Sequence, residues 1–126
     1  MEYRVCRNTP ALYNDLNGKI SLLGLGTMRL PLRDAADQTS IDEEKAQEIF
    51  DYAYAHGVNY FDTAYPYHGG MSEKFCGKAL AKYPRASYHL ASKLPGWLLK
   101  CDEDVPRIFN EQLANCRTDC FDFYLV

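Results

Sequence analysis

The sequence predicts an α/β fold of four parallel strands and three helices, and two observations support this. Apolar runs of strand length alternate with segments of helical periodicity along the whole chain. Each return to a parallel strand needs a crossover helix, so the alternation predicts one parallel sheet. Polar residues gather where the predicted strands end. This favours part of a (β/α)8 barrel over an open doubly wound sheet, because barrel active sites collect at that rim.

The periodic segments give each element its range. Strands are predicted at 20–27, 58–62, 88–94 and 121–126, and helices at 43–55, 72–82 and 102–115. Ser40 and Glu43 have the spacing of a capping box before the first helix, and Gly57 follows its end.

The N-terminal residues 1–19 are predicted to be a separate extension, and residues 20–126 the barrel part. Within the first residues, Tyr3-Arg4-Val5 and Lys19-Ile20-Ser21 flank an Asn17-Gly18 pair that favours a turn, which predicts a short ribbon.

Composition excludes several classes of protein. The 126 residues are 47% hydrophobic and 25% charged, which is ordinary for a globular domain. The net charge of −3 gives no basic excess for nucleic acid, and no apolar run is long enough to span a membrane. The N-terminus has no hydrophobic signal core, so we expect a cytoplasmic protein.

The five cysteines are odd in number, and no Cys-x-x-Cys pair occurs among them. Cys116 and Cys120 with Cys101 upstream do not complete a common zinc or iron–sulfur pattern. We therefore expect reduced thiols and no metal in this chain.

A Gly24-x-Gly26 pair lies near the end of the first predicted strand and could suggest a dinucleotide-binding loop. The fingerprint needs a third glycine three residues on, where this chain has Arg29, and a helix that opens directly from the loop. The predicted helix begins more than ten residues later, so we reject this interpretation.

Three residues at the predicted strand ends form a chemically coherent set. Asp62 ends the second strand, Tyr67 lies five residues on, and Lys93 lies near the end of the third. An ammonium beside a phenol makes the phenol a better proton donor, and a carboxylate keeps that ammonium in place and charged. Such a set can protonate a carbonyl oxygen while hydride reaches the carbon. Tyr65 competes with Tyr67, and only the spacing from Asp62 selects the latter.

At these residues the sequence resembles the aldo-keto reductase family. The resemblance is carried by Phe61-Asp62-Thr63-Ala64-Tyr65-Pro66-Tyr67, Gly70-x-Ser72-Glu73 and Ala91-Ser92-Lys93-Leu94, together with the opening Leu23–Pro31 and the closing Asp122–Val126. It covers about residues 20–126.

The resemblance implies an NADPH- or NADH-dependent reductase of a small carbonyl substrate on a (β/α)8 barrel. Tyr67 would be the general acid, Lys93 would tune its acidity, and Asp62 would hold Lys93 and contact the nicotinamide ribose. The nicotinamide side of the pocket would be lined by Gly26, Thr27 and Met28, and substrate could contact Tyr65, His68 and Trp97.

The resemblance also concerns the extent of the protein. A (β/α)8 barrel takes about 250 residues, so this chain is expected to be the N-terminal half, ending just before the family's active-site histidine. It looks like a subgroup in which an iron–sulfur ferredoxin-like domain often follows the barrel. A half-barrel exposes sheet edges, so we expect possible self-association. The resemblance also implies poor cofactor binding, because in the family the later strands supply most contacts to the phosphates and adenine of the cofactor.

A second function is compatible with the same sequence. The same motif residues would serve a nicotinamide-binding sensor or partner-binding module without turnover.

Overall fold

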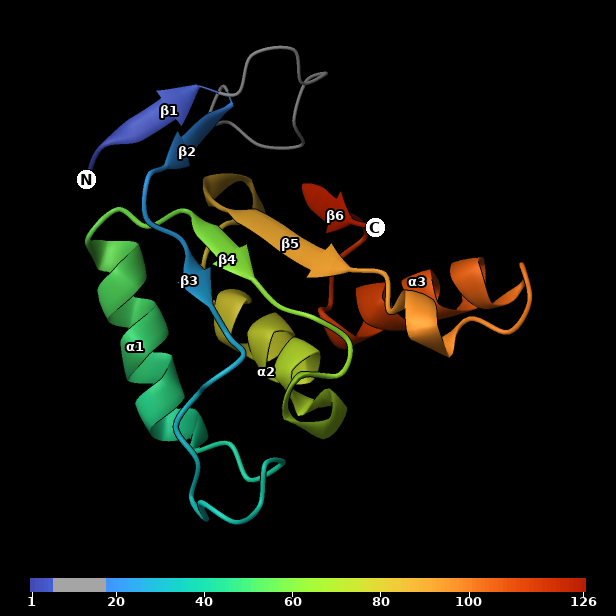
Figure 1. Ribbon diagram of the computed structural model, residues 1–126. Coiled ribbons are helices and arrows are strands. Elements are labelled where there is room, and N and C mark those ends of the chain that lie inside the picture. The colour runs from blue at the N-terminus through green and yellow to red at the C-terminus, as the bar shows by residue number, and fades with distance from the viewer. Residues whose placement is uncertain (6–17) are drawn as a thin grey trace.

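The computed structural model describes residues 1–5 and 18–126, and its described part contains two sheets and three α-helices (Figure 1). The strands are β1 Tyr3–Val5, β2 Lys19–Ser21, β3 Leu25–Gly26, β4 Tyr60–Asp62, β5 His89–Lys93 and β6 Phe123–Leu125. The α-helices are α1 Glu43–Ala55, α2 Met71–Leu80 and α3 Asp104–Asn115. Three 3-10 turns lie at Tyr67–Gly70, Arg85–Ser87 and Gly96–Leu98. No helix of this described part is long and apolar enough to cross a membrane.

The larger sheet is parallel and has the order β3-β4-β5-β6. Strands that follow one another along the chain are neighbours in space, and a helix lies between each pair. This is the topology of part of a (β/α)8 barrel, and it confirms the predicted parallel sheet.

The three helices lie along one side of this sheet, and the main core forms between the two layers (Figure 1). Phe50 of α1 stacks on Phe61 of β4 at 5.3 Å between ring centroids, and Phe75 of α2 meets Phe50 edge-on. The apolar spacing of α1 therefore places Phe50 against Phe61, the buried middle residue of β4.

The N-terminal ribbon is confirmed, because β1 and β2 pair antiparallel with Arg4 opposite Ile20. The predicted strand 20–27, however, is two strands. Its first part completes the ribbon, where the Ser21 amide donates to Asn59 Oδ1 at 2.8 Å, and only β3 joins the parallel sheet. The predicted boundary between residues 19 and 20 thus falls inside β2. Of the predicted turn pair, Gly18 adopts a φ of 72°, and Asn17 lies outside the described residues.

The predicted capping box at Ser40 is wrong. Asp42 is the N-cap of α1, and its side chain accepts from the Lys45 amide. Ser40 still belongs to the loop before the helix, because Ile41 forms a β-bridge with Leu32. The Ser40 hydroxyl therefore donates to the Asp34 and Asp37 carbonyls of that loop.

Candidate functional site

Lys93 and Asp62 form an ion pair at the carboxyl ends of neighbouring strands. Lys93 Nζ lies 2.8 and 2.7 Å from the two carboxylate oxygens of Asp62, and it also donates to the Thr63 carbonyl at 2.8 Å. Both side chains are about 30% exposed, at 30% and 28%. Parallel register places Asp62 opposite Ala91, so Lys93 extends two residues beyond it and its long side chain reaches back.

Tyr67 lies beneath the same ammonium. Lys93 Nζ is 5.1 Å from the centroid of the Tyr67 ring, which is a cation–π distance. The Tyr67 amide donates to the Ala64 carbonyl at 3.2 Å, which fixes the start of the turn that carries the ring. The structure therefore brings the three predicted residues together from two strand ends and one loop.

A pocket of about 270 Å³ opens at this cluster. Its lining residues are Ala64, Pro66, Tyr67, Lys93, Leu94, Pro95, Trp97, Leu125 and Val126. The walls are apolar except for the phenol and the ammonium. A carbonyl compound that enters the pocket therefore meets its polar groups at Tyr67 and Lys93.

The residues predicted to line the nicotinamide side divide into two groups. Gly26 and Met28 are exposed, and an added Cβ at Gly26 would meet no atom within 4 Å, so open space lies beside Asp62, which pairs with Gly26. Thr27 is fully buried, and its hydroxyl bonds the Asp62 carbonyl at 3.0 Å and Ser72 Oγ at 2.8 Å. Its side chain supports Asp62 from behind rather than facing the open space.

His68 is directed away from the pocket. Its Nε2 accepts from the Leu30 amide at 3.1 Å, and its Nδ1 lies 2.9 Å from the Gln38 carbonyl. The residue is 6% exposed and has a φ of 54°. Both ring nitrogens thus hold the loop before α1, which leaves neither for substrate.

Tyr65 and Trp97 border a neighbouring hollow of about 400 Å³ on the outer side of the same loops. Burial raises the pKa of the Tyr65 hydroxyl, and a hydrogen bond to Glu111 acts in the same direction. Trp97, which is 73% exposed, lines both this hollow and the pocket at Tyr67, as does Pro66, so the two spaces adjoin at these residues.

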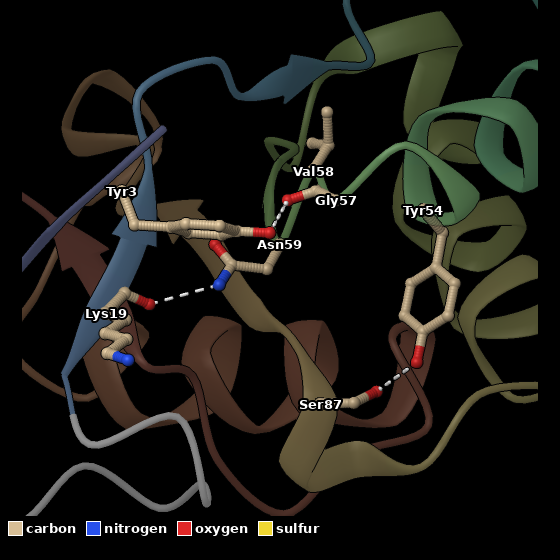
Figure 2. A pocket seen from close by; sticks show the side chains of 7 residues that line it. All are labelled: Tyr3, Lys19, Tyr54, Gly57, Val58, Asn59 and Ser87. Atoms are coloured by element: carbon tan, nitrogen blue, oxygen red, sulfur yellow. Dashed lines mark hydrogen bonds between the residues drawn. The ribbon is translucent and has the colours of Figure 1, made fainter. Parts of the chain in front are cut away.

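A further hollow, of about 440 Å³, lies at the amino ends of the strands beneath the ribbon (Figure 2). Its polar groups already bond one another: Tyr3 donates to the Gly57 carbonyl and Tyr54 to Ser87. Among the described residues that line it there is no acid, and Lys19 is the one ammonium. We therefore place the candidate site in the smaller pocket, where Asp62, Tyr67 and Lys93 lie together.

A buried polar network behind β5 is the feature that sequence reasoning missed. Glu73, Ser92 and Gln112 are all fully buried. The Glu73 carboxylate accepts from Ser92 Oγ and Gln112 Nε2, each at 2.7 Å. The available signal was Gln112 itself, a polar residue one turn after Ile108 on the apolar face of α3.

The described thiols have no metal-binding arrangement. Within residues 1–5 and 18–126, no group of three or more His, Cys, Asp or Glu side chains could hold a metal ion. Burial raises the pKa of Cys76 to about 11, so this thiol stays protonated near neutral pH.

The model of the Aldo/keto reductase family matches residues 22–126. The chain belongs to this family. It is 38% identical over 109 residues to a Schizosaccharomyces pombe protein provisionally named as an aryl-alcohol dehydrogenase, covering 82% of this chain and 30% of that protein. It is 33% identical over 110 residues to L-galactose dehydrogenase of Arabidopsis thaliana, covering 82% and 33%.

Solved aldo-keto reductases share the fold. The holo enzyme of Bacillus halodurans matches 99% of this chain with a TM-score of 0.72 and 29% identity, over 40% of its own length. The Klebsiella pneumoniae enzyme in complex with NADPH matches 87% with a TM-score of 0.68 and 26% identity, over 36%. These neighbours confirm a partial TIM barrel. The chain thus spans less than half the length of these relatives.

Proposed function

We propose that these strands belong to an NAD(P)H-dependent oxidoreductase that reduces an aldehyde or ketone to an alcohol, with Tyr67 as the proton donor. One observation carries the proposal: the Lys93 ammonium is held by Asp62 directly above the Tyr67 ring. An ion pair at this position is expected where a phenol must become a phenolate during turnover.

The residues have distinct parts in the reaction. Tyr67 gives its proton to the carbonyl oxygen, and the positive charge of Lys93 stabilises the phenolate that remains. Asp62 and the Thr63 carbonyl hold the ammonium in place. A proton from solvent then restores the phenol.

Support for the nicotinamide cofactor comes from both geometry and family. The open space beside Gly26 and the exposed Met28 lie next to the partly exposed Asp62 carboxylate. This is where we place the nicotinamide ring and its ribose. A bound nicotinamide supplies the hydride to the carbonyl carbon. NADPH is the molecule bound in the Klebsiella pneumoniae relative, and we propose it here as well.

The substrate is proposed to be small and at least partly apolar. The pocket of about 270 Å³ is walled by apolar side chains, and Trp97 gives it one aromatic wall. Tyr65 lines the neighbouring hollow, and we propose that it contacts substrates long enough to extend past Trp97.

The test uses a chimeric barrel in which this chain replaces the matching strands of the Bacillus halodurans enzyme. NADPH oxidation with an aromatic aldehyde is measured for the parent chimera and for Tyr67→Phe. We expect kcat to fall by about 10² to 10⁴-fold, as for loss of a general acid.

Tyr65→Phe is the matched control, because it removes a hydroxyl from the competing tyrosine two residues away. Loss of activity in Tyr65→Phe but not in Tyr67→Phe would overturn the assignment. NADPH binding without any turnover in the parent chimera would favour the sensor or partner-binding module instead.

A further inference from the structure

Gln112 is a fully buried polar side chain on α3 that lies behind the proposed site and lines neither the pocket at Tyr67 nor the hollow at Tyr65. Its Nε2 atom lies 3.0 Å from the Lys93 carbonyl oxygen, 2.7 Å from Glu73 Oε1 and 3.0 Å from Ser92 Oγ. One side-chain amide therefore reaches both α2 and the end of β5.

The other end of the same amide is also bound. Gln112 Oε1 accepts from the Tyr124 hydroxyl at 2.6 Å, and Tyr124 belongs to β6. Because both ends of the amide have partners, its orientation is fixed, and so is the direction of the bond to Lys93.

The bond to Lys93 matters because of where that residue stands. Its register partner is Leu125, the last residue of β6, and the sheet bonds end one residue later, where the Leu94 amide donates to the Leu125 carbonyl at 2.9 Å. Its ammonium is anchored by Asp62, but the place of a flexible four-carbon side chain depends on where its backbone lies. Gln112 anchors that backbone from the helical side.

We propose that Gln112 is a positioning residue, which holds the backbone of Lys93 so that its ammonium lies between Asp62 and the Tyr67 ring. This inference rests on the proposed function for its catalytic meaning, although the positioning itself is a structural property. Gln112 acts through Lys93 and does not touch substrate.

A purely structural role predicts a different result, and Asn115 allows the two to be separated. Asn115 Nδ2 donates to Glu73 Oε2 at 3.2 Å from the same helix, but no contact joins it to Lys93. Asn115→Ala therefore removes one hydrogen bond from the same buried carboxylate of Glu73 and leaves the bond to the β5 backbone in place.

The first measurement uses NMR on the full chain. The Lys93 ε-methylene signals, assigned with Lys93→Arg, carry a ring-current shift from Tyr67, and Tyr67→Leu defines its absence. We expect Gln112→Met to move these signals toward their position in Tyr67→Leu, and Asn115→Ala to leave them in place.

The second measurement uses the chimeric barrel. We expect Gln112→Met to lower kcat by about tenfold to a hundredfold, the range for a small misplacement of a catalytic group, with the KM for NADPH unchanged. Tyr124→Phe frees Gln112 Oε1 yet keeps the ring and the Glu73 contacts. We expect Tyr124→Phe to shift the Lys93 signals and to lower kcat in the same direction as Gln112→Met, but by less. This variant replaces Gln112→Met in the test if Gln112→Met does not fold.

The proposal is overturned if the Gln112 and Asn115 variants lose equal thermal stability while the Lys93 signals and kcat stay unchanged in both. It is also overturned if Tyr124→Phe leaves the Lys93 signals and kcat unchanged. An inactive parent chimera in which Gln112→Met or Tyr124→Phe still displaces the Lys93 signals would refute the proposed function while supporting the positioning.

Discussion

The two carboxylate oxygens of Asp62 lie 2.8 and 2.7 Å from Nζ of Lys93. Both side chains are only partly exposed, so water screens this pair less than a pair on the open surface. The arrangement orients the ammonium toward the Tyr67 ring, and it underlies the first prediction.

Replacing Asp62 by Asn keeps the shape of the side chain but removes its charge. We expect the ammonium of Lys93 to lose its fixed position, and kcat in the chimeric barrel to fall by about 10²-fold or more. Asp51→Asn is the control, since Asp51 of α1 pairs with Lys82, just after α2, and neither residue lines the pocket. Equal activity of the two variants would contradict the role assigned to Asp62.

His68 is predicted to stabilise the loop before α1. His68→Ala leaves the amide of the buried Leu30 without its acceptor, which costs about 1–3 kcal/mol. Urea unfolding of the full chain measures this loss, and His56→Ala, at an exposed helix end, should change stability by well under half as much. A neutral His68→Ala would show that the loop does not need the ring.

Asp51 is predicted to contribute to stability only above acidic pH. The Lys82 ammonium, followed by the Tyr83 hydroxyl, lowers the pKa of Asp51 from 3.8 to about 2. Between these values the unfolded chain binds the proton first, so the contribution is complete above about pH 4 and is lost as the pH falls toward 2.

Unfolding of Asp51→Asn and of the parent chain across pH 2–7 measures this contribution. The two should differ most near neutral pH and converge in acid. The difference stays below about 1 kcal/mol, because the pair is partly exposed. A difference that grows toward acid would contradict the direction of the pKa shift.

Thiol reactivity is predicted to differ sharply between two cysteines. Cys101 is exposed, whereas Cys76 is fully buried with its pKa raised to about 11. At pH 8, iodoacetamide should therefore modify Cys101 quickly and Cys76 only through opening of the fold. Peptide mass spectrometry over time checks this, and urea should abolish the difference.

Self-association of the chain is also predicted. Within the described residues, β3 and β6 each have one strand neighbour, and Leu22, Leu23 and Leu125 are 56%, 62% and 46% exposed. Exposed edges and apolar groups of this kind favour pairing between chains. Light scattering during gel filtration should show species larger than 14.4 kDa that decrease in Leu125→Lys. A monomer at all concentrations would refute this prediction.

Helices and strands were predictable where periodicity was strong. The three helices lie within two residues of their predicted starts and ends, because their apolar spacing records which face is buried. The strand at 20–27 was not predictable as two strands, because Leu22 and Leu23 look like core residues and only the ribbon reveals them as exposed.

That the candidate site residues lie close together was predictable from the sequence, whereas the direction of some side chains was not. Asp62, Tyr67 and Lys93 follow from the motif spacing, and the structure brings them together. Thr27 and His68 were predicted toward ligands, but hydrogen bonds to Asp62 and to Leu30 direct their side chains elsewhere.

The sequence by itself determined the family, the alternation of elements and the chemical identity of the reactive groups, because each of these is written in local spacing. Only the tertiary structure decided that the Lys93 ammonium lies over the Tyr67 ring and that His68 contacts the Gln38 carbonyl. The same holds for the bond from Gln112 to the Lys93 carbonyl. Those relationships join residues 19 to 38 positions apart, or run between helix and strand, and depend on how the layers pack. Local patterns record burial and spacing, but they do not record the partner that a buried polar group finds.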